Sequence, residues 1–399
     1  MIRSPKIFDI KNKEENKIKK FSKFLALLLA ACMALALAAC GEAPAAESEE
    51  PAAVSEEPAA ESGAPAEDAE VAPLTVGLLG TAVKPVGVLV ADALGYFDEE
   101  GVEIDFEKVS SMNDAYMAVS TGDLDVYLFS STAAATFIAQ GTTTLRVFGG
   151  TVGEGSEIMA AAGTPEITGL EDLLGKTIAC QMPETGQMVL KNYIMEQGYT
   201  FGAPGEGADI TFVYVNDAIP AIEGCVKGEY DYCITNSCLG YYADQYGAAL
   251  VGTVKQFVDP YPCCRQACNE ATYEENFEAL VRFEIANLRG YEYYLNNMEE
   301  TLDILEDYSG EDRDFLQAQL YGTEGYTPVM RVSLDPDKDA CVEFYQAMVN
   351  IGEVEDTGVD WDQYVVTDVY STALERLMER EPDNALWQDL SEYFAGHNS

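Results

Sequence analysis

The sequence is poor in basic residues and almost free of histidine: its 399 residues include 23 Lys and Arg, 69 Asp and Glu, and one His. The net charge of −46 argues against nucleic acid and anionic lipid as partners, because the long-range field repels both. His397 lies near the end of the chain, where no Ser-His or Cys-His catalytic pair is expected. A glycine-rich phosphate loop of recognised form is also missing. We therefore expect a binding protein without a cofactor or a metal, and not an enzyme.

The apolar stretch near the N-terminus, residues 24–39, is shorter than the roughly 20 residues that a membrane-spanning helix needs. A basic segment precedes it, which is typical of an export signal. Its ending, Leu37-Ala38-Ala39-Cys40, resembles the lipobox of bacterial lipoproteins. The resemblance implies that residues 1–40 are a signal peptide, that Cys40 is lipidated, and that the mature chain lies on the extracytoplasmic face of a cell membrane. An ordinary signal cut nearby, or an uncut anchor, is the alternative.

Residues 41–73 contain no Lys or Arg and consist almost entirely of Ala, Glu, Pro, Ser and Gly. The unit Ser-Glu-Glu-Pro-Ala-Ala occurs at 48–53 and again at 55–60. Such a segment has few large apolar side chains to bury, and its like charges repel one another. We predict a disordered acidic tether that holds a folded domain away from the lipid surface.

The folded part should begin near Leu74 and span about 326 residues, which suits two lobes better than one core. The leader contributes a net charge of +5, so the mature chain carries −51. Short apolar strands alternate with helices over 74–148 and again over 164–254, and a largely helical region follows from Tyr273. This pattern predicts an α/β fold with mainly parallel sheets, whose ligands bind at the C-terminal ends of the strands.

Ten cysteines are present, of which Cys32 and Cys40 belong to the leader. An exported chain with an even number of remaining cysteines could contain disulfides, but a chain of this length does not need them. Buried free thiols are therefore favoured. The group Cys263, Cys264 and Cys268 is a candidate metal or thiolate site, although it lacks a fourth ligand and a usual zinc spacing. Buried or cleft-lining thiols are the favoured interpretation.

Four passages resemble those of one family, in the family's order: Leu94–Ile104 (LGYFDEEGVEI), Thr121–Val126 (TGDLDV), Leu170–Ala179 (LEDLLGKTIA) and Lys227–Tyr232 (KGEYDY). The chain is identified by them as similar to the nitrate/sulfonate/taurine and thiamine-pyrimidine solute-binding proteins of ABC importers. This resemblance implies a two-lobed type II periplasmic-binding fold that closes on a small molecule.

The resemblance also implies boundaries and partners. Lobe 1 would comprise residues 74–160, lobe 2 residues 161–257, and residues 258–399 would return to lobe 1 with a helical C-terminal region. The two crossings between the lobes are expected near Ile158–Gly163 and Lys255–Pro262. The implied partners are a small solute, a membrane permease and its ATPase, with the protein itself a monomer.

Several polar residues stand where a strand turns into a helix, and there the free N–H groups of a helix start, together with hydroxyl groups, can hold a ligand. Simple capping of the helices is the alternative for the Ser, Thr and Asn residues. Others lie near the expected crossings. The candidate ligand-binding residues are Gly80, Thr81, Ser130, Ser131, Thr132, Glu154, Ser156, Thr185, Gly186, Gln187, Asn216, Asn236, Ser237, Cys263, Cys264 and Arg265.

The charge of the ligand stays open at this point. A sulfonate or nitrate would need a cation, and Lys84 and Arg265 lie near the expected cleft. The strongly acidic composition instead favours a neutral or cationic solute, such as a thiamine-pyrimidine-like heterocycle. A lipoprotein that senses a ligand and signals to a membrane partner is the alternative function, and an enzyme of the same fold is a more distant one.

Overall fold

The computed structural model describes residues 71–182, 184–236 and 238–399, all within one compact unit, Pro65–Ser399. The predicted signal peptide, the lipobox with Cys40 and residues 41–70 of the predicted tether lie outside these ranges. No helix within the described ranges is both long and apolar enough to cross a membrane.

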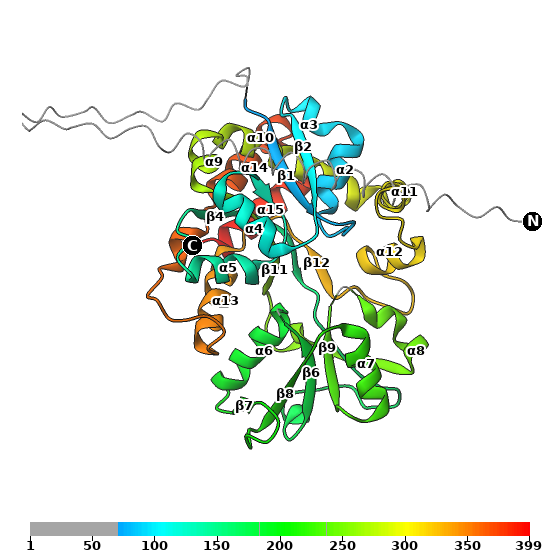
Figure 1. Cartoon of the computed structure of the whole chain (residues 1–399). Coiled ribbons are helices and arrows are strands. Elements are labelled where there is room, and N and C mark those ends of the chain that lie inside the picture. Colours follow the sequence, from blue (N-terminus) through cyan, green and yellow to red (C-terminus); the bar gives the residue numbers. More distant parts are fainter. Residues whose placement is uncertain (1–70, 183, 237) are drawn as a thin grey trace, which may run out of the picture. The chain divides into compact units, whose positions relative to one another are not determined.

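The first sheet is mixed, with two parallel and three antiparallel strand pairings. Its strands are β1 (Leu74–Leu79), β2 (Ile104–Val109), β3 (Val126–Tyr127), β4 (Leu145–Glu154), β11 (Pro262–Asn269) and β12 (Met330–Val332), in the order β12-β4-β11-β3-β1-β2 (Figure 1). Strand β1 pairs in parallel with β2 and β3, as βαβ units require. Strand β11 runs antiparallel to β3 and β4 because it returns from the second sheet. The prediction of a mainly parallel sheet is therefore correct for the N-terminal half.

The second sheet has the same plan. Its strands are β5 (Glu157–Ala161), β6 (Thr177–Gln181), β7 (Phe201–Gly202), β8 (Ile210–Val215), β9 (Tyr232–Thr235) and β10 (Ala248–Thr253), in the order β10-β5-β9-β6-β8-β7. Residues Ile158–Ala160 are fully buried within β5, so the chain crosses from the first sheet at Gly155–Ser156. This crossing is earlier than the predicted Ile158–Gly163. The return crossing, between Thr253 and Pro262, lies where it was expected.

The helices of the two sheets begin and end at the signals that the sequence shows. They are α2 (Val86–Leu94), α3 (Tyr96–Glu99), α4 (Met112–Thr121), α5 (Ser131–Ala139), α6 (Thr185–Glu196), α7 (Ala218–Lys227) and α8 (Ala243–Tyr246), with 3-10 turns η1 (Leu170–Leu173), η2 (Leu239–Tyr242) and η3 (Val254–Gln256). At α4, for example, the Oγ atom of Ser111 accepts a hydrogen bond from the Asp114 N–H at 3.3 Å. Gly122 ends the same helix with φ of 81°, a conformation that glycine adopts without steric strain.

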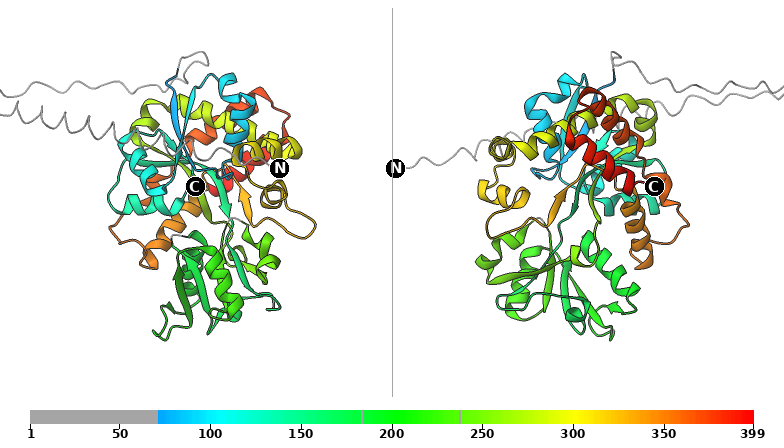
Figure 2. Two further views of the ribbon diagram at one scale, coloured as in Figure 1. Left: turned by 45° about the vertical axis from the view of Figure 1, so that its right-hand side comes forward. Right: turned by 180° about the vertical axis from the view of Figure 1, so that it is seen from behind.

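The C-terminal helices pack back onto the first sheet, as the family resemblance implied (Figure 2). They are α9 (Glu270–Glu275), α10 (Phe277–Asn296), α11 (Met298–Ser309), α12 (Arg313–Leu320), α13 (Lys338–Asn350), η4 (Trp361–Tyr364), α14 (Asp368–Arg380) and α15 (Ala385–His397). Helix α10 lies directly on α2, where a Cβ atom on Gly290 would stand 2.1 Å from the Gly87 carbonyl oxygen. Only glycine at position 290 permits this close approach. Helix α14 packs on α10 and on β4.

Two C-terminal helices also contact the second lobe. Helix α13 packs against α6, and α12 packs against η2. Besides the crossings, the contacts of α13 with α6 and of α12 with η2 therefore help to join the two lobes.

Candidate functional site

The N-termini of α5 and α6 meet between the two sheets. Helix α5 follows β3 of the first sheet, and α6 follows β6 of the second. The Oγ1 atoms of Thr132 and Thr185, both in the first turn of their helix, are 3.2 Å apart and buried. Because a helix start carries free N–H groups and partial positive charge, two such ends facing each other form a polar site. The structure thus brings together two of the sequence-predicted clusters.

A carboxylate caps the α6 end of this site. Glu184 is buried, and its two carboxylate oxygens accept hydrogen bonds from the N–H groups of Gly186, at 3.0 Å, and Gln187, at 2.7 Å. The hydroxyl of Ser156, on the first crossing, donates to the same carboxylate. Burial raises the pKa of Glu184, and the hydrogen bonds from Ser156, Gln187 and Gly186, with the charge of Lys84, oppose that rise. The first crossing and α6 are therefore held together through one buried acid.

Gly186 allows this contact because it has no side chain. A Cβ atom at this position would stand 2.1 Å from the Ser156 hydroxyl oxygen. Ser156 is itself fixed from the second crossing, since its N–H donates to the hydroxyl of Tyr261 at 3.1 Å. Both crossings thus converge on the start of α6.

The α5 end of the site carries a cation and two thiols. Ser130 lies in the left-handed region, with φ of 63°, and its Oγ accepts from the Ala133 N–H at 3.1 Å. The half-buried Lys84 places its Nζ 4.0 Å from the sulfur of Cys263, and the sulfurs of Cys263 and Cys264 are 3.8 Å apart. Burial lowers the pKa of Lys84, but the nearby sulfurs and the Glu184 carboxylate outweigh it, so the pKa is raised and the amine is charged. The cation thus lies near groups from both lobes.

Two buried side chains at the site lack partners. The hydroxyl of Ser131 and both polar atoms of the Gln187 amide have no hydrogen-bond partner among the described residues. Both side chains are fully buried. Since buried polar groups in native proteins are nearly always hydrogen-bonded, these atoms indicate where a ligand or water would bind. Donor and acceptor stand side by side on Gln187.

Other sequence-predicted residues lie elsewhere. Gly80, Thr81 and Asn216 are exposed, and Asn236 is half-buried after β9. The carbonyl of Gly80 accepts a hydrogen bond from the Tyr308 hydroxyl at 3.3 Å. Ser237 lies outside the described residues. Among the described residues, no hydrogen bond joins Gly80, Thr81 or Asn216 to Thr132 or Thr185.

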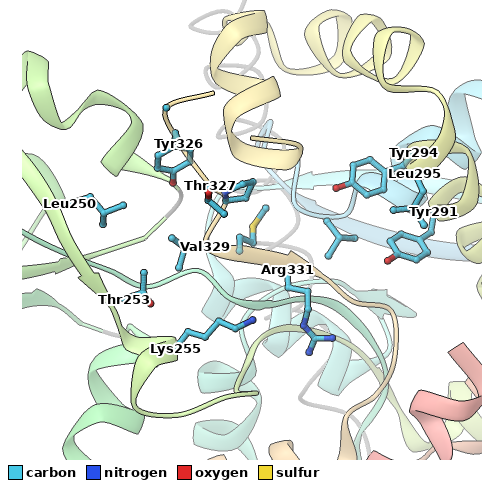
Figure 3. A pocket seen from close by; sticks show the side chains of 14 residues that line it. Leu250, Thr253, Lys255, Tyr291, Tyr294, Leu295, Tyr326, Thr327, Val329 and Arg331 are labelled. Atoms are coloured by element: carbon cyan, nitrogen blue, oxygen red, sulfur yellow. The ribbon is translucent and has the colours of Figure 1, made fainter. Parts of the chain in front are cut away.

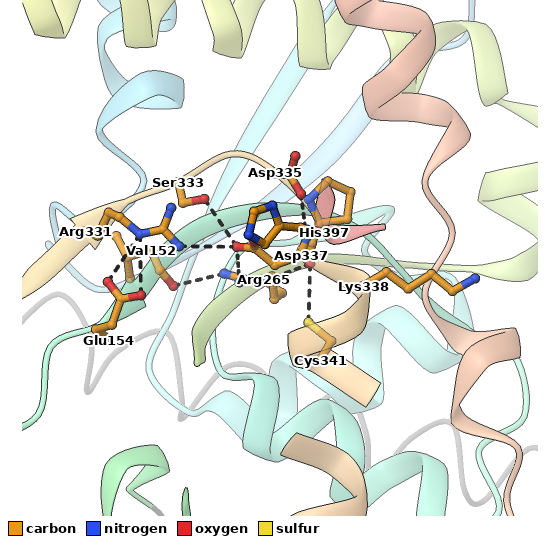
Figure 4. A network of polar contacts seen from close by, with 12 residues as sticks. Val152, Glu154, Arg265, Arg331, Ser333, Asp335, Asp337, Lys338, Cys341 and His397 are labelled. Atoms are coloured by element: carbon orange, nitrogen blue, oxygen red, sulfur yellow. Dashed lines mark hydrogen bonds and ion pairs between the residues drawn. The ribbon is translucent and has the colours of Figure 1, made fainter. Parts of the chain in front are cut away.

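Arg265 is not beside the thiols in the site but inside the first lobe (Figure 4). Its guanidinium is fully buried and forms an ion pair with Asp337, with Nη2 2.8 Å from Oδ2. It also donates to the carbonyl groups of Pro336 and Val152, each at 3.1 Å. The N–H donors of Arg265 are therefore bound to groups within the first lobe. Of the two cations considered from the sequence, Lys84 is the one that lies at the site.

Glu154 lies directly before the first crossing, where it takes part in an ion cluster. It ends β4 with φ of 54°, and its buried carboxylate lies 3.3 Å from Arg331 of β12 (Figure 4). The same carboxylate lies 3.8 Å from Lys255 of η3, whose side chain Figure 3 shows. Burial raises the pKa of Glu154, and the two cations oppose that rise. Lys255 and Arg331 also border a cavity of about 740 Å³ to which both lobes contribute residues. The ion cluster therefore joins the first crossing, the second crossing and β12.

Two further contacts hold the lobes together on either side. The Tyr326 hydroxyl donates to the buried carboxylate of Glu157, at 2.6 Å, and Asn350 of α13 donates to Asn192 of α6, at 3.0 Å. Neither pair could be predicted from the sequence, because the members of each are far apart along the chain. The lobes are in contact around the polar site.

Glu184 is the main site residue that sequence reasoning missed. It stands directly before the predicted cluster Thr185–Gln187, but Glu is not among the residues preferred as helix caps. Its position between Pro183 and the start of the helix is the feature of the sequence that could have indicated its role as a cap. Within the described ranges, no group of three or more His, Cys, Asp or Glu residues is arranged to hold a metal ion.

Comparison with known proteins gives a family and a fold. A family model described as NMT1/THI5 like matches residues 84–301. No curated protein sequence matches the chain. The fold resembles that of the periplasmic nitrate-binding protein NrtA from Synechocystis PCC 6803, at 12% identity and a TM-score of 0.60, over 77% of this chain and 89% of that one.

Two further solved structures share the fold. The periplasmic aliphatic sulphonate binding protein SsuA from Escherichia coli aligns at 16% identity and a TM-score of 0.58, over 74% of this chain and 92% of that one. The desulfurization enzyme DSZB aligns at 15% identity and a TM-score of 0.51, over 76% and 99%. The periplasmic-binding fold is therefore shown, and the same fold also serves an enzyme.

Proposed function

The chain belongs to the NMT1/THI5-like family, and from this premise we propose that it is the extracytoplasmic solute-binding component of an ABC importer. It captures one small molecule between its two lobes and delivers it to a membrane permease driven by an ATPase. A lipid on Cys40 holds it at the outer face of the membrane through the acidic tether. The observation that supports this proposal most is the buried contact between Thr132 and Thr185, since these residues open helices that follow strands of different sheets.

The groups at the site favour a ligand that is not an anion. At the start of α6 the Glu184 carboxylate already accepts from the free N–H groups, and at the start of α5 stand Cys263 and Cys264. An anion would bring a further negative charge into this buried space, against one cation, Lys84. We therefore propose a neutral or cationic heterocycle over a sulfonate-like anion.

The amide of Gln187, which has no hydrogen-bond partner among the described residues, narrows the chemical class of the ligand further. An amide offers one donor and one acceptor side by side, and the ligand that satisfies both carries the complementary pair. An amino group next to a ring nitrogen, as in an aminopyrimidine, has that arrangement. The Ser131 hydroxyl supplies one more donor or acceptor. A sulfonate or nitrate is the second candidate, because Lys84 is charged.

Signalling and catalysis fit the structure less well. A sensor would close in the same way, so only its membrane partner would distinguish it from a transport protein. For an enzyme, the one histidine, His397, lies on α15 and stacks on Tyr393 with ring centroids 3.8 Å apart. It is not among the residues that meet at the site.

The proposal is tested by a melting-temperature screen of the protein against aminopyrimidines, amines, sulfonates and nitrate. We expect an aminopyrimidine to raise the melting temperature, since a ligand at one hundred times its Kd adds about 2.7 kcal/mol to the free energy of unfolding. A shift with sulfonate alone would contradict the ligand class but leave the transport role intact. Turnover of a stabilising compound would contradict the proposed function.

Replacing Ser131 or Thr185 by alanine is expected to weaken binding of the stabilising compound by about tenfold without unfolding the protein. Ser131 loses a hydroxyl that has no partner, whereas Thr185 loses the contact with Thr132. Binding is measured by isothermal titration calorimetry and folding by circular dichroism. Thr211→Ala, a change on β8, serves as the control. Unchanged affinity in both site variants would show that the ligand binds elsewhere.

A further inference from the structure

The two adjacent cysteines at the site point to the same side of their strand. In a regular strand, neighbouring side chains alternate between the two faces. Here the pairing of β11 with β4 shifts register between Pro262 and Cys264 and again between Cys264 and Arg265. Such irregularities break the alternation. As a result the sulfurs of Cys263 and Cys264 lie 3.8 Å apart.

The surroundings stabilise one thiolate in the pair. The hydrogen bond from Cys263 lowers the pKa of Cys264 to about 6, against the effect of burial, and Lys84, the Ser130 N–H and Arg265 act in the same direction. The same hydrogen bond, together with burial, raises the pKa of Cys263 well above its ordinary value, so the proton of the pair is on Cys263. At neutral pH the pair therefore holds one proton and one negative charge.

The two thiols differ in exposure. Cys263 is half-buried, whereas Cys264 is 5% exposed. Cys263 is thus the more accessible member of the pair. The other described cysteines, Cys180, Cys225, Cys233, Cys238, Cys268 and Cys341, are all buried. Cys263 is therefore the most exposed of the described thiols.

We propose that Cys263 and Cys264 form a thiol–disulfide exchange site that converts between a dithiol and a disulfide of adjacent residues by reaction with small extracellular disulfides. The pair offers an accessible sulfur, a second sulfur within reach of it, and a lysine beside both.

The exchange balances without a further reagent. As the Cys263 sulfur attacks one sulfur of the external disulfide, its proton passes to the neighbouring Cys264 thiolate. The attack breaks the external S–S bond, expels one small thiolate and leaves a mixed disulfide on Cys263. The thiol of Cys264 gives its proton to that leaving thiolate. The Cys264 thiolate then attacks the Cys263 sulfur and expels the second small thiolate. The two cysteines are oxidised, and the external disulfide is reduced to one thiol and one thiolate.

Oxidation removes the negative charge beside Lys84 and draws the two sulfurs together next to the second crossing. Both changes occur where the solute is captured, a consequence that rests on the proposed function. We expect the disulfide form to bind an aminopyrimidine about tenfold more weakly, because a counter-ion of Lys84 is lost and the strand is displaced. The redox state of the surroundings would then regulate capture.

The test treats the purified full chain with oxidised glutathione at pH 7, without denaturant or solute. We expect the peptide that contains both cysteines to lose two hydrogen masses and to retain no glutathione. The rate should rise with pH around an apparent pKa near 6. Absence of the disulfide, or a glutathione adduct that persists in the wild-type chain, would overturn the proposal.

Variants separate the two roles. Cys264→Ser should stop at a glutathione adduct on Cys263, since no second sulfur is present to resolve it. Cys268→Ser, a buried position farther along the same strand, should form the disulfide like the wild-type chain. If Cys264→Ser does not fold, Cys263→Ser provides the test of the proposal. In that variant the peptide that contains residues 263 and 264 should form no disulfide between them. None of these readouts needs a solute, so their failure is distinguishable from failure of the proposed function.

Discussion

Replacing Glu184 by alanine is expected to weaken solute binding by at least about tenfold and to lower the free energy of unfolding by about 2 kcal/mol. The change removes the cap of α6 and leaves two N–H groups and the Ser156 hydroxyl without their acceptor. The first crossing and the second lobe then lose the buried group that joins them. Chemical denaturation gives the stability, and calorimetry with the stabilising compound gives the affinity.

The control for this change is Glu196→Ala at the other end of α6, where the side chain is exposed and reaches only Asn192. Stability and affinity should change little there, because exposed polar contacts contribute little. Glu184→Gln, which keeps an acceptor but removes the charge, should fall between the wild type and the alanine variant. If the alanine variant binds solute and unfolds like the wild type, the proposed role of Glu184 at the site is wrong.

Relative to a Glu284→Gln variant, the wild type is expected to lose on the order of 3 kcal/mol of stability as the pH rises from about 5 to about 8, because of one buried acid in the first lobe. Glu284 of α10 is fully buried, and burial raises its pKa to about 8. One of its oxygens accepts hydrogen bonds from Gln266, at 2.9 Å, and Asn287, at 3.2 Å. Between the unfolded and folded pKa values the folded chain holds a proton that the unfolded chain has lost, so stability decreases with pH.

Glu284→Gln should abolish most of this decrease and make the protein more stable than the wild type at pH 9. Cys264 acts in the opposite direction over part of the range, since its folded pKa of about 6 is below the ordinary thiol value. The difference between wild type and variant therefore isolates Glu284. Urea unfolding at several pH values gives the measurement, with Glu275→Gln, an exposed acid on α9, as the control. Equal slopes in wild type and Glu284→Gln would contradict the assignment.

Local signals predicted much of the secondary structure correctly. Short strands alternate with helices over 74–148 and 164–254, and a largely helical region follows from Tyr273, as the residue pattern predicted. These features depend on residues close together in the chain, so capping chemistry and the spacing of apolar side chains are sufficient. The clusters at Ser130–Thr132 and Thr185–Gln187 were found for the same reason, since each opens a helix after a strand.

The partners of charged residues could not be predicted in this way. Arg265 looked like a ligand-binding cation because Asp337, its partner, lies in a distant segment. Glu154 looked like a cleft residue because its partner, Arg331, could not be identified from the sequence. Arg331 lies on β12, a strand of three residues that no sequence pattern indicated. The shift in register at Cys264 arises from pairing between β11 and β4, which the sequence of β11 alone does not contain.

Trapping of a molecule between two moving lobes is tested most directly by small-angle X-ray scattering of the full chain, with and without the compound that raises its melting temperature most. We predict that the radius of gyration decreases when this compound is added, and that Glu184→Ala reduces the change. An unchanged radius of gyration in the presence of a saturating, stabilising compound would contradict closure of the lobes on a solute.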